Sequence, residues 1–341
     1  MKRFTRPRRV WTHASSWHIT LFISGLITIL AVAVHVAPLA VDAQPAGEVH
    51  HIGFLRFGPP PPTWVEALRQ GLREFGQIEG KNIAIEYAVA PSVTQLPEVA
   101  AELVRHKIDV LVASGTPSVL PAKNATSTVP IVFVASIDPI ATGVVPSLAR
   151  PGGNITGVTS MYTEAIGKRL QLLAELFPKL SKIAVLVRDH PDQAQRLREA
   201  ELAARAFGVQ LQVLRVRDPR DFEGAFNAAR GASALLQLDD ALFTANRTQV
   251  AELALKNRLP TMVGHRELVE AGGLLAYGAD YEYLYRRAAM FVDKILKGAK
   301  PADLPVEQPT KFELVINLKT ARALNLTIPP SLLLRADRIV E

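Results

Sequence analysis

Apolar runs alternate with amphipathic stretches along most of the chain. The run HIGFLRF (51–57) has the continuous apolar character of a buried strand, and it ends at a proline-rich turn. The next stretch, TWVEALRQGLREFG (63–76), places Leu68, Leu72 and Phe75 at spacings of four and three, which is the pattern of one helix face. Strands that alternate with helices in this way predict βαβ units and parallel sheets.

The alternation occurs in two series. Strand-like runs of the first series lie at 51–57, 82–88, 108–114, 130–136 and 154–160. Those of the second lie at 182–189, 209–216, 233–239, 260–264 and 273–278. Each series is long enough to form its own core between two layers of helices. We therefore predict an α/β protein with two doubly wound parallel-sheet lobes, rather than one continuous sheet.

The first 44 residues have a different pattern, which is typical of an export signal. Five basic residues within the first nine precede an apolar stretch, ITLFISGLITILAVAVHVA (19–37), and the sequence VDA-Q follows at 41–44. Small residues at positions 41 and 43 predict cleavage after Ala43. The apolar stretch is close to the ~20 residues that span a bilayer, so an uncleaved N-terminal anchor is the alternative.

The charge balance supports targeting rather than nucleic-acid binding. The formal net charge is +7, but the first 44 residues contain five basic residues and one acidic residue, so the remainder carries only +3. That charge is scattered, which argues against a nucleic-acid partner. The chain has no cysteine, so it has neither disulfides nor thiolate chemistry. We expect an extracytoplasmic (periplasmic) protein.

Candidate chemistry concentrates where the predicted strands end, which is the edge where open parallel sheets bind ligands. A helix that starts near Thr116, with Pro117 in its first turn, could hold a ligand carboxylate. Asp138, Asp239 or Asp240 could receive an ammonium group. Together these groups suit a zwitterion such as an amino acid.

Each of these signals also has an ordinary structural interpretation. Thr116 and Ser118 could only cap a helix, Asp138 before a proline is a common turn former, and Asp240 could be the N-cap of a helix over 241–258. The aromatic residues of these segments could stack on a ligand, but they could equally pack in the core: Trp64, Tyr162, Phe243 and Tyr277. The recurrence of such residues at one edge is the stronger observation.

Other chemistries lack their motifs. The sequence contains no phosphate-binding G-x-x-x-x-G-K-[ST], no G-x-S-x-G and no H-E-x-x-H. Within the glycine-rich stretch SLARPGGNITGVTS (147–160), the segment PGGNITG (151–157) contains no Lys or Arg to hold phosphates, so we interpret the stretch as a turn and strand at the lip of a cleft. We predict no catalytic residues, no metal site and no cofactor.

Three longer phrases resemble one protein family. They are SLARPGGNITGVTS, ASGTPSVLPAKNATSTVPIVFV (113–134) and ILKGAKPADLPVEQPTKFELVINLKTARALNLTIPPSLLLRADRIVE (295–341). They resemble ABC-transporter substrate-binding proteins of the tryptophan-binding-protein-like group, which have a type I periplasmic-binding fold. The resemblance covers about residues 49–341. It implies two α/β lobes joined by a three-crossover hinge: 50–160 as lobe 1, 163–277 as lobe 2, and 278–341 as a return to lobe 1 and the hinge.

The resemblance also implies a set of ligand contacts. By position these are Thr116, Pro117, Ser118, Asp138, Asp240 and Tyr277, to which we add the aromatic residues Phe57, Trp64, Tyr162 and Phe243. Two segments depart from the family. FGPPPPTW (57–64) replaces a first loop that usually contains glycine and an acid, and Asp239 stands where proline is common. Both departures fall in the expected pocket, so they put the identity of the ligand in doubt.

The implied function is solute capture for an ABC importer. The chain would close its hinge on a small polar ligand, an amino acid of aromatic or branched type, and deliver it as a monomer to a membrane permease. A ligand-sensing module for a membrane receptor is the alternative, and an enzyme on the same fold would need a nucleophile and base that the sequence does not display.

Overall fold

The computed structural model describes residues 49–160, 162–190 and 193–341, with the backbone alone for 162–164. The predicted leader over 1–44 lies outside the described residues. Within the described part of the chain, no helix is both long and apolar enough to cross a membrane.

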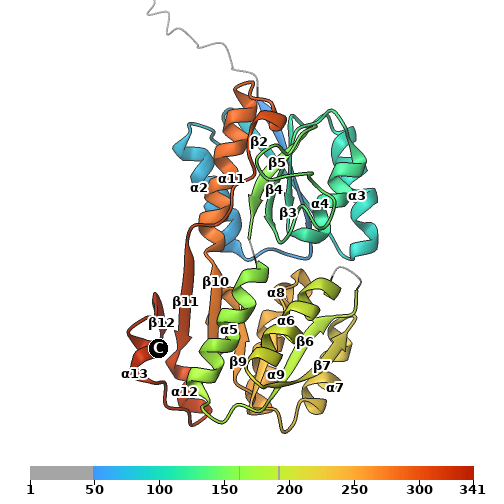
Figure 1. The fold of residues 1–341 in the computed structure, drawn as a ribbon. Coiled ribbons are helices and arrows are strands. Elements are labelled where there is room, and N and C mark those ends of the chain that lie inside the picture. The colour runs from blue at the N-terminus through green and yellow to red at the C-terminus, as the bar shows by residue number, and fades with distance from the viewer. Residues whose placement is uncertain (1–48, 161, 191–192) are drawn as a thin grey trace, which may run out of the picture. The chain divides into compact units, whose positions relative to one another are not determined.

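The first lobe contains a five-stranded, wholly parallel sheet in the order β2-β1-β3-β4-β5 (Figure 1). Its strands are β1 (His50–Phe57), β2 (Ile83–Ala90), β3 (Val110–Ser114), β4 (Ile131–Ser136) and β5 (Ile155–Thr159). Strands β3, β4 and β5 are buried along their whole length, as their continuous apolar runs predict.

Helices cover both faces of this sheet. On one face α2 (Pro62–Glu74) packs against α11 (Tyr281–Leu296), and on the other face lie α3 (Leu96–Arg105) and α4 (Thr116–Ala125). Gly71 permits the close approach of α2 to α11, because a Cβ there would lie 2.8 Å from the Cβ of Ala289. The helix that completes this lobe therefore comes from a segment about 120 residues beyond its last strand.

The second lobe contains a seven-stranded sheet in the order β12-β11-β10-β9-β8-β6-β7. Its strands are β6 (Lys182–Arg188), β7 (Gln210–Val216), β8 (Ala234–Gln237), β9 (Thr261–Val263), β10 (Leu275–Ala279), β11 (Phe312–Asn317) and β12 (Arg338–Val340). The strands from β6 to β10 are parallel, whereas β11 runs antiparallel to β10 and carries β12 parallel to itself.

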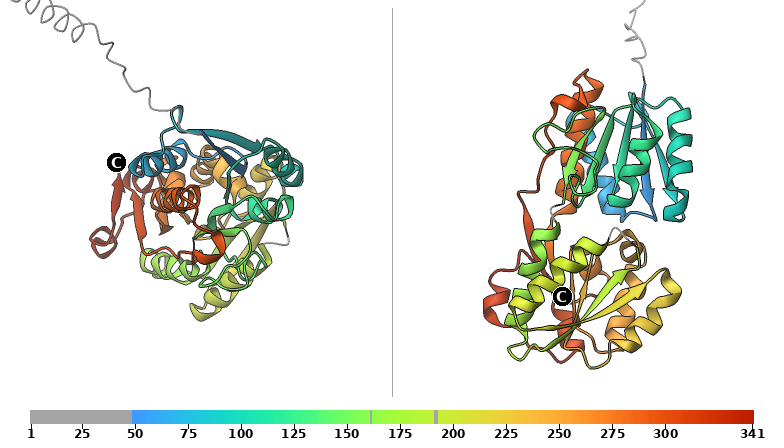
Figure 2. Two further views of the ribbon diagram at one scale, coloured as in Figure 1. Left: turned by 90° about the horizontal axis from the view of Figure 1, so that it is seen from above. Right: turned by 45° about the vertical axis from the view of Figure 1, so that its right-hand side comes forward.

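Two layers of helices enclose this sheet as well (Figure 2). One layer comprises α5 (Tyr162–Leu176), α6 (Ala194–Ala206), α12 (Leu318–Ala323) and α13 (Pro330–Leu333). The other comprises α7 (Phe222–Ala228), α8 (Ala241–Ala245), α9 (Arg247–Lys256) and α10 (Arg266–Glu270). The α/β class and the two lobes agree with the sequence prediction.

The end of the chain lies elsewhere than predicted. We expected 278–341 to return to the first lobe and the hinge, but only 281–307 packs on the first lobe. There α11 packs on α2, and the backbone N–H of Thr159 donates to the carbonyl of Glu307 at 2.9 Å. From Phe312 onward the chain is back in the second lobe, where β11 pairs with β10. The apolar pattern of β11 predicts a buried strand but does not specify the sheet, which is why the assignment was wrong.

Candidate functional site

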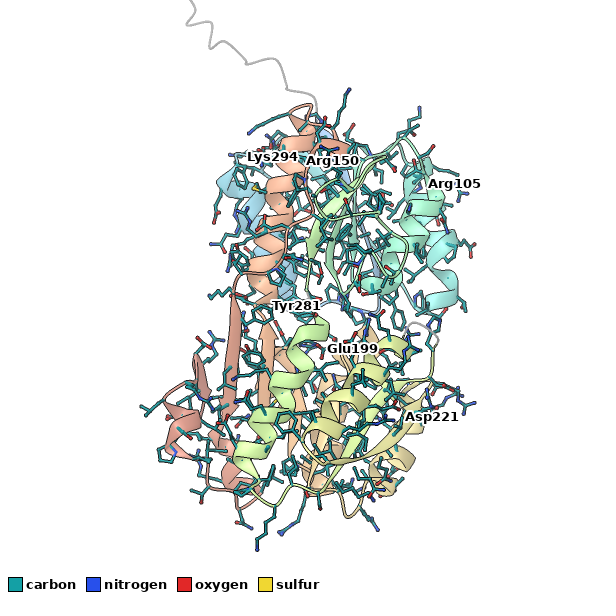
Figure 3. The ribbon with its side chains drawn as sticks, in the orientation of Figure 1. Arg105, Arg150, Glu199, Asp221, Tyr281 and Lys294 are labelled. Atoms are coloured by element: carbon teal, nitrogen blue, oxygen red, sulfur yellow. The ribbon has the colours of Figure 1, made fainter. Side chains whose placement is uncertain are left out.

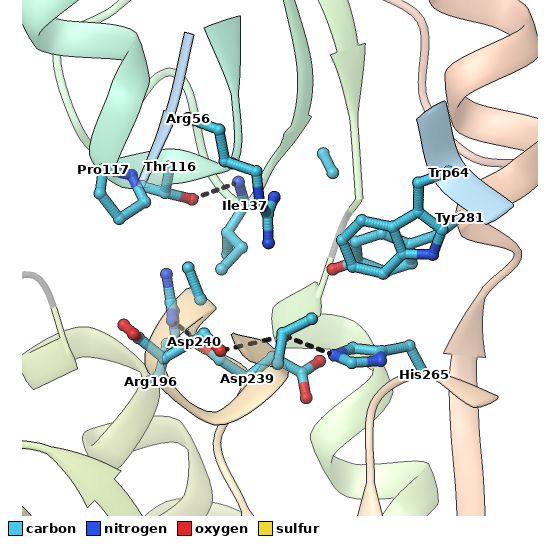
Figure 4. A pocket seen from close by; sticks show the side chains of 14 residues that line it. Arg56, Trp64, Thr116, Pro117, Ile137, Arg196, Asp239, Asp240, His265 and Tyr281 are labelled. Atoms are coloured by element: carbon cyan, nitrogen blue, oxygen red, sulfur yellow. Dashed lines mark hydrogen bonds between the residues drawn. The ribbon is translucent and has the colours of Figure 1, made fainter. Parts of the chain in front are cut away.

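A cavity lies between the strand ends of the two lobes (Figure 4). The first lobe contributes residues from the ends of β1, β3 and β4 and from the starts of α2, α4 and α11: Arg56, Trp64, Gly115, Thr116, Pro117, Ala135, Ile137 and Tyr281. The second lobe contributes residues from α6 and from the segments after β8 and β9: Arg196, Asp239, Asp240, Ala241, Thr244 and His265. Figure 3 places Tyr281 at the level where the lobes meet. Neither lobe forms the cavity alone.

Arg56 dominates the wall that the first lobe provides. It lies at the end of β1, one residue before Phe57, and its side chain is almost fully buried, with 3% of the residue exposed. One guanidinium nitrogen donates to Ser114 Oγ at 3.0 Å, and the guanidinium carbon lies 5.1 Å from the ring centroid of Trp64. The Ser114 hydroxyl in turn hydrogen-bonds to the hydroxyl of Tyr285. Neutral groups and an aromatic face therefore surround this cation.

The start of α4 forms a second part of the same wall. Gly115, with φ of +79°, is the N-cap residue, and Pro117 lies in the first turn. The Thr116 hydroxyl accepts a hydrogen bond from the backbone N–H of Ile137 at 3.1 Å, so it joins α4 to the segment after β4. Thr116 thus holds two loops of the wall together, rather than capping its own helix.

Two buried aspartates form the opposite wall, and each is already neutralised by an arginine behind it. Asp240 is the N-cap of α8, with Oδ1 accepting from the N–H of Leu242 at 2.8 Å. Its Oδ2 accepts from Arg188 Nε at 2.7 Å and from Gln193 at 2.9 Å.

Asp239 is held in a comparable way. Its Oδ1 accepts from the N–H of Gly264 at 3.0 Å, and its Oδ2 lies 3.3 Å from a terminal nitrogen of the buried Arg169. Arg169 also donates from Nε to the carbonyl of Tyr277 at 2.7 Å. Since both carboxylates have structural partners, this wall presents no uncompensated negative charge among the described residues.

A hydrogen-bonded group joins the two lobes at one side of the cavity. The indole N–H of Trp64 on α2 donates to Oε1 of Glu267 on α10. The other oxygen of Glu267 lies 3.2 Å from Nδ1 of His265, whose Nε2 lies 3.1 Å from the Thr244 hydroxyl. Burial raises the pKa of Glu267, but the bonds from His265 and Trp64 outweigh it and leave this pKa below its usual value. The carboxylate therefore remains ionised and holds the lobes together.

The cavity is small in this arrangement. Its volume is about 40 Å³, which is room for only a few water molecules at roughly 10–15 Å³ each. A ligand of amino-acid size therefore requires the walls to separate first.

Charged residues also gather at the second and third crossovers between the lobes. This crossover cluster comprises Arg266, Asp280, Glu282, Lys311 and Glu313, with Arg266 3.7 Å from Asp280 and 3.6 Å from Glu313. Burial, together with the repulsion from Asp280 and Glu267, outweighs the attraction of Arg266 and raises the pKa of Glu313 to about 7. The crossovers thus contain a carboxyl group that titrates near neutrality.

Four of the ten contacts expected from the sequence line the cavity: Trp64, Thr116, Pro117 and Asp240. Five others lie outside its lining. Ser118 is buried inside α4, and Asp138 closes its own turn by accepting from the N–H groups of Ile140 and Ala141.

The remaining aromatic candidates have packing roles. Phe243 is fully buried with its ring centroid 5.9 Å from that of Phe222, and Tyr277 stacks on Phe312. Phe57 is partly buried against the cores of both lobes. The side chain of Tyr162 lies outside the described residues.

Sequence reasoning missed the cationic members of the lining. It did not consider Arg56, Arg196, His265 or Tyr281 as ligand contacts. Arg56 did carry a signal, because it is the one charged residue in the run HIGFLRF, where every neighbour predicts burial. In the described part of the chain, no group of three or more His, Cys, Asp or Glu side chains could hold a metal ion.

Comparisons with known proteins identify the family. The family described as ABC transporter substrate binding protein matches residues 60–340. A tyrosine-binding protein of Clostridioides difficile (strain R20291) is 30% identical over 261 residues, which is 75% of each chain.

Two solved structures have the same two-lobed fold. A conserved domain protein from Vibrio cholerae superposes with a TM-score of 0.81 at 28% identity, covering 86% of this chain and 100% of that one. The ABC domain in complex with L-Trp from Streptococcus pneumonia gives 0.80 at 25% identity with the same coverage. The matched family consists of substrate-binding proteins and not of enzymes, and substrate-binding proteins of ABC transporters work outside the cytoplasmic membrane. The chain with its cavity between two α/β lobes belongs to the family of ABC-transporter substrate-binding proteins.

Proposed function

We propose that this protein is the solute-binding component of an ABC importer, which captures a small ligand by hinge closure and delivers it to a membrane permease. The observation that carries the proposal is the composition of the cavity wall, with eight lining residues from the first lobe and six from the second. Contacts drawn from both lobes exist together only when the lobes are closed. A ligand that bridges them therefore favours closure by its differential affinity for that state.

The size of the cavity supports a cycle of opening and closing. About 40 Å³ cannot admit an amino acid, so the arrangement described here corresponds to a closed form that must open to load. The hydrogen bond between Trp64 and Glu267 would break and re-form in each cycle. A permease that recognises only the closed shape would then distinguish loaded from empty protein.

The relatives indicate which ligands to test first. One is named for tyrosine binding and another was solved with L-Trp. Trp64 and Tyr281, with ring centroids 4.5 Å apart, provide an aromatic side to the cavity here. Aromatic amino acids and their close analogues are therefore the first compounds to test, with branched amino acids next.

Export of a monomer by an N-terminal signal belongs to the same proposal. Cleavage after Ala43 would release the binding protein, whereas retention of 1–44 would leave it anchored and favour a sensing role. N-terminal sequencing of the exported protein, together with its mass in solution, separates these forms.

The decisive experiment combines ligand stabilisation with scattering. A ligand present at 100 times its Kd should stabilise the protein by about 2.7 kcal/mol, and the same ligand should reduce the radius of gyration. Uptake of that ligand by cells should fall when the gene is deleted. Binding without any contraction, or chemical conversion of the ligand, would refute the proposal.

A further inference from the structure

Arg56 is a buried cation for which the structure provides no anion. Only 3% of the residue is exposed, and no carboxylate oxygen of the described residues lies within 4.0 Å of its guanidinium. Its Nε is buried without a hydrogen-bond partner in the described part of the chain. Burying a charge is costly unless it is paired. An anionic ligand that pairs with the Arg56 guanidinium would explain why a cation is buried at this position.

The direction of the side chain agrees with this role. Arg56 lines the cavity, and Figure 4 shows its guanidinium pointing from the end of β1 toward the space between the lobes. The planar guanidinium can hold a carboxylate through two parallel hydrogen bonds. The start of α4 at Thr116 lies along the same wall and adds the positive end of a ten-residue helix.

The opposite wall is unsuited to an ammonium group. All four carboxylate oxygens of Asp239 and Asp240 already accept hydrogen bonds, two of them from the buried arginines 169 and 188. An ammonium beside either aspartate would approach a guanidinium at the same time. It would lose its hydration without gaining an uncompensated negative charge.

We propose that the ligand of this site is a small organic carboxylate without an ammonium group, and that Arg56 binds its carboxylate. The inference rests on the proposed function, since it concerns the same cavity, but it narrows the ligand to a class other than free amino acids. The side chain of the ligand lies over the apolar residues of the first lobe, Pro117 and Ile137, beside Tyr281. Asp239 and Asp240 shape the opposite wall and do not contact a charge on the ligand.

Matched ligands test this assignment directly. Titration calorimetry with the full chain compares three compounds of one skeleton: 3-(indol-3-yl)propanoate, L-tryptophan and tryptamine. The phenyl and 4-hydroxyphenyl series, and 4-methylpentanoate against leucine, repeat the comparison for other side chains. We expect the carboxylate to bind at least tenfold more tightly than the amino acid in the series that fits, and the amine not to bind.

Variants of Arg56 provide the second test. Arg56→Gln should weaken carboxylate binding at least about thirtyfold, as for the loss of one partner of a buried charge pair, and Arg56→Lys should retain part of the affinity. Arg105→Gln, an exposed arginine on α3 of the same lobe (Figure 3), should bind as the wild type does. Without ligand, Arg56→Gln should melt at or above the wild-type temperature, because it removes an unpaired buried charge; a purely structural arginine would lower that temperature.

The outcomes separate this inference from the proposed function. Amino acids that bind more tightly than their carboxylates, or carboxylates that bind Arg56→Gln unchanged, would overturn the inference and leave solute capture intact. If only neutral or cationic solutes bind and the lobes contract around them, the carboxylate inference is likewise overturned and solute capture is retained. If no ligand contracts the protein, both the carboxylate inference and the proposed function are refuted.

Discussion

Gly264 lies directly against the carboxylate of Asp239, and this contact makes a glycine necessary there. A Cβ at this position would lie 1.6 Å from Oδ2 of Asp239, and the N–H of Gly264 also donates to Oδ1. A side chain at Gly264 would therefore displace the aspartate from Arg169, its buried partner. The position of the Asp239 carboxylate therefore excludes any side chain at residue 264.

We accordingly expect Gly264→Ala to lower the free energy of unfolding by about 3 kcal/mol or more, the cost of breaking a buried ion pair. Urea denaturation measures the change. Gly167→Ala is the matched control, since Gly167 lies in α5 with nothing within 4 Å of an added Cβ, and it should be neutral or slightly stabilising. A Gly264→Ala variant as stable as the wild type would mean that Asp239 can relocate freely.

At the residue scale, sequence reasoning finds groups whose chemistry depends on local neighbours. Asn317 directly precedes the helix that begins at Leu318, where asparagine is a preferred N-cap residue, and its side chain does accept from the N–H of Thr320. It misses groups whose role depends on distant partners. Whether Asp240 binds a ligand or caps a helix depends on Arg188, 52 residues away, and periodicity carries no information on that contact.

At the element scale, the type of each element follows from its own pattern, whereas its placement does not. The predicted helix over 241–258 is divided into α8 and α9 at Asn246, whose side chain donates to the carbonyl of Leu242. Strand β11 is buried on both faces, with Leu314 and Ile316 in one core and Val315 in the other. Because either sheet has an edge that helices flank and that could bury such a strand, the apolar pattern does not predict which sheet β11 joins.

The crossover cluster gives a pH dependence at this scale. The pKa of Glu313 is about 7, mainly because of burial, so the folded protein binds this proton more tightly than the unfolded chain, whose carboxyl has a pKa near 4.5. Stability should therefore fall as the pH rises from about 4.5 to about 7. Glu313→Gln should melt at a higher temperature than the wild type at pH 8, and the difference should vanish near pH 4.

Thermal melts across this pH range measure the effect. Glu223→Gln, an exposed residue that pairs with Lys256 on the surface, should follow the wild type at every pH. A melting temperature of Glu313→Gln that parallels the wild type throughout would show that Glu313 is not desolvated in solution.

At the scale of the whole molecule, the hydrogen bond between Trp64 and Glu267 joins the two lobes directly and can be tested separately from any ligand. Trp64→Phe removes the indole N–H, and Glu267→Leu removes its acceptor. Each should enlarge the radius of gyration of the ligand-free protein, because the closed arrangement loses a charge-assisted bond. The double variant should open no further than either single variant, since both remove the same interaction. Additive opening in small-angle scattering would contradict a direct coupling between the two residues.

The chain passes between the lobes three times, and this has a consequence for how the protein is made. Helix α11, which covers α2, is synthesised only after most of the second lobe, and β11 follows later still. Neither half is a contiguous stretch that could mature while the remainder is still being translated. A polypeptide that ends before α11 begins at Tyr281 would leave both halves incomplete, and one that ends before β11 would still lack part of the second lobe, so maturation of one half is tied to that of the other.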